Sequence, residues 1–304
     1  MIDTEIKNLL SVCKLCPSAC EVNRTAGQKG KCGEDSRLRI ARAALHHWEE
    51  PCISGTCGSG TVFFTGCSLR CGFCQNQLIS RGMHGQEISI QRLSDIFFEL
   101  EQQGAHNINL VTPTHFIPQI KAALSKAKNA GLRIPIVYNS SGYEQVSGLI
   151  LLDGLIDIYL TDIKFLSPEV SFRLAGTRDY FSAAEMALQE MHRQTGEPVL
   201  DTNGIMQKGV IVRHLMLPGY LFDTRNILHF LCENYANRIY ISLMNQYTPP
   251  NEKTDHIPDR KLNKEHYERM ITYLQDWGID LAYVQEDGTA DESFIPAFDF
   301  TGVK

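Results

Sequence analysis

The chain has 304 residues, of which 43% are hydrophobic, and it carries a formal net charge of −6 at pH 7. This composition provides enough apolar residues for a globular core, and the negative charge gives no electrostatic reason to expect a nucleic-acid partner. No run approaches the roughly 20 apolar residues of a membrane-spanning helix. The first residues also lack the basic start and apolar core of a signal peptide. We therefore expect a cytoplasmic protein without a membrane partner.

Cysteine is concentrated at the start of the chain. Nine of the ten cysteines lie between Cys13 and Cys74, and only Cys232 lies beyond them. In a cytoplasmic protein, such crowding indicates metal binding rather than disulfides. Cys232 follows an apolar run, which predicts a small core residue on a helix.

Residues 1–57 are rich in cysteine and glycine and show little periodic pattern. They predict a small metal-stapled module that buries too little apolar area to fold alone. Four thiolates, enough to close a metal site, come from Cys13, Cys16, Cys20 and Cys32. Zinc in such a site would be structural, whereas a second iron–sulfur cluster would relay an electron or bind substrate. The spacing alone does not decide between the two.

Two further cysteines, Cys52 and Cys57, lie just upstream of the first predicted strand of the main domain. Either could replace one of the four ligands or remain a reduced thiol. His46 and His47, next to Trp48, are expected at the surface or in packing rather than at a metal.

The stretch TGCSLRCGFCQN contains Cys67, Cys71 and Cys74, with Phe73 just before the last cysteine. Three thiolates within eight residues can face one iron–sulfur cluster, but they are one short of the usual four ligands. A 4Fe-4S cluster held in this way keeps one iron open for a ligand that is not protein. Two alternatives are three buried cysteines without a ligand role, and a zinc site, which usually comes as paired Cys-x2-4-Cys hooks.

From about residue 60, short apolar strands alternate with amphipathic helices. The predicted strands are 60–66, 108–112, 135–139, 157–164, 210–217, 238–244 and, as a possible seventh, 280–285. Helical patterns cover residues 89–104 and 114–131, and Gly104 and Gly131 stand where helix C-caps are expected.

This alternation implies a parallel sheet. Six strand–helix units are too few for a closed eight-fold barrel, so we expect an α/β fold of the open partial (β/α)6 barrel type, with its chemistry at the carboxyl ends of the strands. The expected organisation is a cysteine-rich module over residues 1–57, a core domain over 58–250, and a C-terminal helix and strand extension over 251–304.

Several segments resemble the radical S-adenosylmethionine (SAM) superfamily, specifically the group around the activating enzyme of pyruvate formate-lyase and its PflX-like branch. They are CKLCPSACEVNR (13–24), GQKGKCG (27–33), EEPCISG (49–55), FFTGCSLRCGFCQN (63–76), NLVTPTHFIPQI (109–120) and YISLMNQYTPP (240–250). The resemblance implies that SAM binds the open iron of a cluster on Cys67, Cys71 and Cys74. An electron from the cluster would cleave SAM to methionine and a 5′-deoxyadenosyl radical.

The resemblance also suggests SAM contacts at the ends of the second and third predicted strands. Thr112 and Thr114 stand where such enzymes carry Gly-Gly-Glu, which holds the SAM amino group, although Thr114 could instead cap the following helix. Asn139 and Ser140 align with a segment near the SAM ribose and carboxylate.

Five more residues are assigned by the same resemblance. Asp162 and Lys164 match an Asp-x-Lys segment, in which Lys164 would pair with the SAM carboxylate or form a strand-end salt bridge with a neighbouring acid. Arg213 would face the barrel and orient substrate or cofactor, a position that is costly for a charge without a partner. Gln246 would lie near the ribose, and Phe73 beside the adenine or in plain core.

The resulting hypothesis is an oxygen-sensitive radical SAM enzyme that takes a hydrogen atom from a protein, peptide or small molecule. Its reductant would be a flavodoxin or ferredoxin, and its target could be a glycyl radical enzyme. One alternative is a non-catalytic electron carrier or zinc-stapled scaffold. Another is a peptide-modifying radical SAM enzyme with an auxiliary cluster on the front cysteines.

Overall fold

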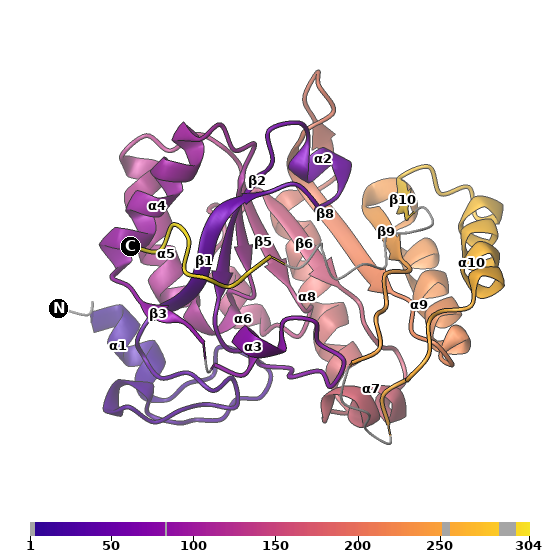
Figure 1. Cartoon of the computed structure of the whole chain (residues 1–304), viewed down its shortest axis with the longest axis horizontal. Helices are drawn as coiled ribbons and strands as arrows, with labels where there is room; N and C mark the ends of the chain where they lie inside the picture. The colour runs from indigo at the N-terminus through magenta and orange to yellow at the C-terminus, as the bar shows by residue number, and fades with distance from the viewer. Residues whose placement is uncertain (1–3, 83, 251–255, 286–295) are drawn as a thin grey trace.

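Ten strands join into one sheet in the computed structural model, which describes residues 4–82, 84–250, 256–285 and 296–304 (Figure 1). The strands are β1 Arg39–His46, β2 Ser59–Phe64, β3 Gln86–Glu87, β4 Ile108–Val111, β5 Ile136–Ser140, β6 Ile158–Asp162, β7 Val199–Leu200, β8 Met206–Leu215, β9 Tyr240–Met244 and β10 Ala282–Val284. In space they run in the order β10-β9-β8-β6-β5-β4-β2-β1-β3, and β7 pairs with β8 off this path.

Parallel pairing links β2, β4, β5, β6, β8, β9 and β10 in succession. These seven strands correspond to the seven predicted from the sequence, with their ends shifted by a few residues. The sheet order is open, because β10 and β3 stand at opposite ends of the path. The prediction of an open partial barrel is therefore confirmed, with β10 as the seventh parallel strand.

The α-helices are α1 Thr4–Ser11, α2 Pro51–Ser54, α3 Gln77–Ser80, α4 Ile90–Gln102, α5 Ile117–Asn129, α6 Val146–Ile150, α7 Pro168–Ala175, α8 Tyr180–Thr195, α9 Leu221–Asn234 and α10 Lys264–Asp276. Short 3-10 helices cover η1 Arg24–Ala26, η2 Thr114–Phe116 and η3 Ala236–Arg238. The predicted helix 89–104 is α4, whose Ser89 hydroxyl accepts a hydrogen bond from the Arg92 amide. The predicted helix 114–131 begins as η2 and continues as α5. In the described part of the chain, no helix has the length and apolar character needed to cross a membrane.

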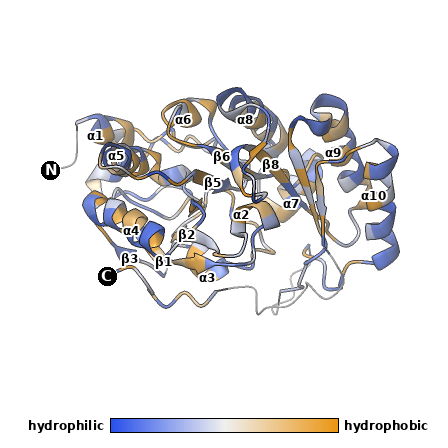
Figure 2. Cartoon of the chain, turned by 90° about the horizontal axis from the view of Figure 1, so that it is seen from above, coloured by the Kyte–Doolittle hydropathy of each residue, from blue (hydrophilic) through white to orange (hydrophobic). Residues whose placement is uncertain are grey.

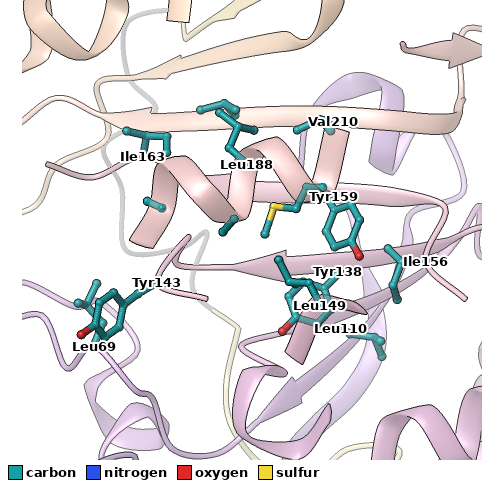
Figure 3. Packing of buried hydrophobic residues seen from close by; sticks show 14 of the residues in the cluster. Leu69, Leu110, Tyr138, Tyr143, Leu149, Ile156, Tyr159, Ile163, Leu188 and Val210 are labelled. Atoms are coloured by element: carbon teal, nitrogen blue, oxygen red, sulfur yellow. The ribbon is translucent and has the colours of Figure 1, made fainter. Parts of the chain in front are cut away.

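Helices α5, α6, α8 and α9 lie along one side of the sheet, and α3 and the C-terminal segment lie on the other (Figure 2). Figure 3 shows the core between sheet and helices, where Tyr138 and Tyr159 lie close to Leu149 of α6. The two tyrosine rings meet edge to face at 5.7 Å between centroids. The Tyr138 hydroxyl donates to Glu144 and that of Tyr159 to Gln194, so both buried hydroxyls have partners.

Strand β1 is missing from the prediction, which treated residues 1–57 as a module of little periodic pattern. It pairs antiparallel with β2, and Ile40 and Ala41 are fully buried. Its sequence RIARAALH mixes arginine with alanine, which hides the strand pattern. Arg39 is paired with Glu34 and Asp35. The main sheet therefore begins upstream of residue 57.

Residues 296–304, here called the C-terminal strap, run along β1 and cross in front of it in Figure 1. The Ala43 amide donates to the carbonyl of Thr301 (2.9 Å), and the Phe300 amide donates to that of Ala41 (3.1 Å). Phe298 packs edge to face on Phe63 of β2, with 5.4 Å between ring centroids. The strap thus closes one side of the barrel with residues far from β1 in sequence.

Replacing Gly302 by alanine should separate the strap from β1. Gly302 has a φ of +70°, and a Cβ there would lie 2.0 Å from the Ala43 carbonyl oxygen. Gly278 is the matched control, since its φ is +66° and nothing lies within 4 Å of a Cβ. We expect Gly278→Ala to cost about 1–2 kcal/mol of unfolding free energy and Gly302→Ala at least twice as much. Equal losses in thermal or urea unfolding would contradict the close strap contact.

Candidate functional site

A cavity of about 430 Å³ opens at the carboxyl ends of the parallel strands, within the size range of small-molecule sites. Its wall includes Phe63 of β2, Val111 of β4, Asp162 of β6, Leu215 of β8 and Ser242 of β9. Pairing in register brings these strand ends to one edge, as expected for this class of barrel.

The residues predicted to hold the first cluster and SAM line this one cavity, apart from Thr114. They are Cys67, Cys71, Cys74, Phe73, Thr112, Asn139, Ser140, Asp162, Lys164, Arg213 and Gln246. Thr114 is not among the lining residues: its hydroxyl donates to the Glu144 carboxylate (2.6 Å). The structure does not place it with the other predicted SAM contacts. It does not cap a helix either, because the N-cap of η2 is Pro113.

The three cysteines of the site come from the loop after β2, residues 65–76, here called the cysteine loop. Backbone hydrogen bonds hold it at several points, from the Gly66 amide to Ile79 (2.8 Å) and from the Gly72 amide to Leu174 (2.9 Å). Leu69 is fully buried and anchors the middle of the loop. Because both the backbone and Leu69 are fixed, the thiols are held at the cavity wall before any ligand binds.

Burial and charge set the state of these thiols. Burial raises the pKa of Cys67 and of Cys71, and the Lys164 ammonium opposes that rise. Burial lowers the pKa of Lys164, but the carboxylate of Asp162 outweighs this effect and raises it. Without a metal the buried thiols are therefore protonated, and a bound cation is needed to hold them as thiolates.

Lys164 already has a partner, since its Nζ lies 2.5 Å from Asp162 Oδ2. This is the strand-end salt bridge that the sequence left open as an alternative. Asp162 also lines the cavity, so the pair presents both a cation and an anion to a ligand.

The donor set fits an iron–sulfur cluster with one open iron. Three thiols from one loop share a wall of a cavity that also contains polar groups from neighbouring strands. Over the described ranges of the chain, no three His, Cys, Asp or Glu side chains converge on one point as ligands of a single metal ion. Thiolates of a cluster bind different irons, so convergence is not required of them.

The strand ends near Asn139 are tightly fixed. Thr112 has a φ of +58°, and its amide donates to the Asn139 carbonyl (2.8 Å). A β-branched residue with left-handed backbone is strained, and such strain is concentrated at functional sites. A Cβ on Gly142 would meet the Asp162 carbonyl at 2.1 Å, so β5 and β6 approach too closely there for any side chain.

Phe73 belongs both to the cavity wall and to the core, and its position beside the adenine stays a prediction. It lines the cavity, and its ring packs edge to face on Phe165 (6.1 Å) and at a tilt on Tyr247 (6.4 Å). Gln246 accepts a hydrogen bond from Gln285 Nε2 (3.1 Å), which fixes its side chain at the cavity edge.

Arg213 faces the cavity and is paired with two carboxylates that the sequence analysis did not assign to the site. Its Nε donates to Glu50 Oε1 (2.8 Å), and it also pairs with Glu49. Asn109 of β4 donates to Glu49 Oε1 (2.9 Å), so the group bridges opposite parts of the barrel. We name Glu49, Glu50 and Arg213 the barrel triad. The cost of an inward arginine predicted a partner, but nothing local identified Glu49 and Glu50.

The remaining cysteines lie outside the cavity. Cys13, Cys16 and Cys32 are buried in the N-terminal segment, and Cys20 is partly buried there. Cys52 packs in a separate apolar cluster with Ile53, and Cys57 is exposed. Cys232 is buried on α9, as predicted. Of the adjacent His46 and His47, His46 lines the cavity, as does Trp48.

The fold is an open partial (β/α) barrel, which the chain shares with SuiB, described below. No protein-family profile matches the sequence. The chain is 30% identical over 291 residues to the uncharacterised protein MJ0674 of Methanocaldococcus jannaschii, a match that covers 91% of this chain and 78% of that protein. The chain therefore belongs to the same family as MJ0674.

Among solved structures, SuiB of Streptococcus suis, determined with its precursor peptide SuiA, has a TM-score of 0.51 at 14% identity. The match covers 73% of this chain and 47% of SuiB, so the chain spans about half of SuiB. A radical SAM methyltransferase of Sphaerobacter thermophilus has a TM-score of 0.47 at 14% identity, covering 76% of this chain and 67% of that one. Methylornithine synthase (PylB) has a TM-score of 0.46 at 12% identity, covering 74% and 72%.

Removing the positive charge of the barrel triad should strongly destabilise the protein. In Arg213→Met, the buried Glu49 and Glu50 lose their common partner, so we expect a loss of about 3–5 kcal/mol. Arg193 pairs with Asp153 and Glu190 at the surface, with its side chain 55% exposed. Arg193→Met should therefore cost at most about 1 kcal/mol. Similar losses for the two variants in chemical denaturation would contradict the role of the triad.

Glu144 should make stability fall as the pH rises. Burial raises its pKa from 4.5 to about 7. The folded state then holds a proton that the unfolded chain has released. The resulting stabilisation is fully present below pH 4.5 and is lost as the pH rises through 7. From pH 4 to pH 8, the unfolding free energy of the wild type relative to Glu144→Gln should drop by about 3 kcal/mol. A difference independent of pH would exclude a raised pKa.

Proposed function

We propose that the protein is a radical SAM enzyme whose 4Fe-4S cluster is held by Cys67, Cys71 and Cys74. The observation that carries this proposal is that all three cysteines of one loop line a cavity together with polar residues from the strand ends. When bound, the cluster and SAM would supply a 5′-deoxyadenosyl radical that takes a hydrogen atom from substrate.

The side chains around the cavity can perform the binding tasks of such a reaction. Lys164 offers a cation for the SAM carboxylate, while Asp162 holds its ammonium in place. Asn139 and Ser140 supply polar groups at the end of β5, and Thr112 does so at the end of β4. Phe73 provides an apolar face for the adenine. Arg213 and Gln246 line the part of the cavity toward β8 and β9, where they would orient substrate or cofactor.

The substrate we propose is a protein or peptide. SuiB, which shares the fold, was determined with a precursor peptide. Activation of a glycyl radical enzyme, as in the PflX-like branch, is one form of this proposal, and modification of a short peptide is another. The electron would come from a flavodoxin or ferredoxin. A small-molecule substrate is the alternative.

A non-catalytic iron–sulfur or zinc protein is the rival function. It is favoured by the replacement of Gly-Gly-Glu with Thr112-Pro113-Thr114, which removes the carboxylate expected at the SAM amino group. SAM binding separates the two functions, because a carrier should show no change in the spectrum of its reduced cluster when SAM is added.

Cys71→Ala should reduce the formation of 5′-deoxyadenosine to background. The measurement uses anaerobically reconstituted, dithionite-reduced protein with SAM and no added substrate. Cys232→Ala is the control, because Cys232 is a buried thiol on α9 away from the cavity. It should retain the wild-type rate.

Two results would count against the enzyme. One is wild-type product formation by Cys71→Ala, which would remove the cluster assignment. The other is an intact wild-type cluster that neither forms product nor changes its spectrum with SAM, which would favour the carrier.

A further inference from the structure

Gly30 leaves space beside two of the four N-terminal cysteines. A Cβ built on Gly30 would lie 3.1 Å from the sulfur of Cys20 and 3.4 Å from that of Cys32. Burial raises the pKa of the Cys16 thiol, and the nearby Cys32 and Cys13 add to this rise. Cys32 is therefore a neighbour both of Cys20 and of Cys16, and it joins the four cysteines into one cluster.

Arg24 adds a buried positive charge to this group. Its side chain is fully buried, and its Nη1 lies 3.8 Å from the sulfur of Cys13. The guanidinium donates to the backbone carbonyls of Asp35 and His115. In the part of the chain that the structure describes, it forms no ion pair with a carboxylate.

Because a buried charge without a counter-charge is costly, an anionic partner would stabilise this site. Four thiolates on a metal centre carry a net negative charge and would provide it. Neutral thiols would not.

The same segment lies directly against the cysteine loop. The Cys67 amide donates to the carbonyl oxygen of Cys32 (3.3 Å). Two residues on, Glu34 accepts a hydrogen bond from the Thr65 hydroxyl (2.8 Å). A Cβ on Gly33 would meet the Arg70 guanidinium at 2.8 Å. Cys32 and Cys67 are therefore neighbours through one backbone hydrogen bond, although 35 positions separate them in the sequence.

We propose that Cys13, Cys16, Cys20 and Cys32 hold a second 4Fe-4S cluster, and that the hydrogen bond from Cys67 to Cys32 couples it to the centre in the cavity. The spacing alone does not exclude zinc, but three close ligands with a remote fourth occur in ferredoxins, and the hydrogen bond to the cysteine loop suits a redox centre. Zinc sites are usually built from two paired hooks. The coupling rests on the proposed cluster at Cys67, Cys71 and Cys74, whereas the second cluster itself does not.

Metal and sulfide analysis tests the second cluster directly. Anaerobically reconstituted wild-type protein should contain about eight iron and eight acid-labile sulfide per chain. Cys20→Ser should lose about half of each, whereas Cys57→Ser, which changes an exposed thiol, should lose none.

A triple variant, Cys67→Ser with Cys71→Ser and Cys74→Ser, tests the second cluster without the first. It should keep about four iron. This variant keeps the proposal testable even when Cys20→Ser fails to fold. One zinc with about four iron in the wild type would overturn the proposal, as would a triple variant that is folded but free of iron. Failure to cleave SAM with eight iron present would reject the proposed function and leave the second cluster standing.

Electron paramagnetic resonance of the reduced proteins tests the coupling. The wild-type spectrum should be broadened by magnetic interaction between two neighbouring clusters, and Cys20→Ser should lack this broadening. A wild-type spectrum equal to the sum of the Cys20→Ser and triple-variant spectra would overturn the coupling.

Discussion

The candidate site depends on the in-register parallel pairing of β2, β4, β5 and β6. Parallel hydrogen bonding sets Val111 beside Asn139, and Ser140 beside Thr161, so successive strands end at one edge. Residues that long helices separate in the sequence are thereby brought to one edge of the sheet. The strained backbone of Thr112 and the close approach at Gly142 are consequences of this crowding. The cysteine loop continues from the same edge, which places its thiols opposite the polar strand ends.

The two buried arginines, Arg213 in the barrel and Arg24 in the N-terminal segment, have different kinds of partner. In the barrel, Arg213 is shared by Glu49 and Glu50, and burial is compensated within the protein. At the N-terminal segment, the hydrogen bonds of Arg24 go to carbonyl oxygens and a sulfur. The charge of Arg213 is therefore paired within the protein, whereas the proposed second cluster would supply the counter-charge of Arg24. For this reason we assign Arg213 to a stabilising group of ion pairs, and Arg24 to a proposed binding site.

Much of the barrel could be predicted because buried parallel strands are continuous apolar runs that stand out between helices. The cysteine spacing likewise identified Cys67, Cys71 and Cys74 as neighbours. Strand β1 was missed since Arg39 and Arg42 interrupt its apolar pattern, and their partners are not visible locally. Glu49 and Glu50 were missed because Arg213 is more than 160 positions away. The contact of Thr114 was not predicted, because its hydroxyl donates to the buried Glu144, which lies 30 positions away in the sequence.

The C-terminal strap also determines at what stage of synthesis this side of the barrel can be completed. The hydrogen-bond partners of β1 at Phe300 and Thr301 follow it by more than 250 residues in the sequence, so β1 is made long before them. Until the strap is made, one edge of β1 and the Phe63 face beside the cavity remain uncovered. An unpaired strand edge is prone to pair with other chains. Assembly of iron and sulfide on Cys67, Cys71 and Cys74 is thus expected only after residues 296–304 have been made and the strap has packed on β1.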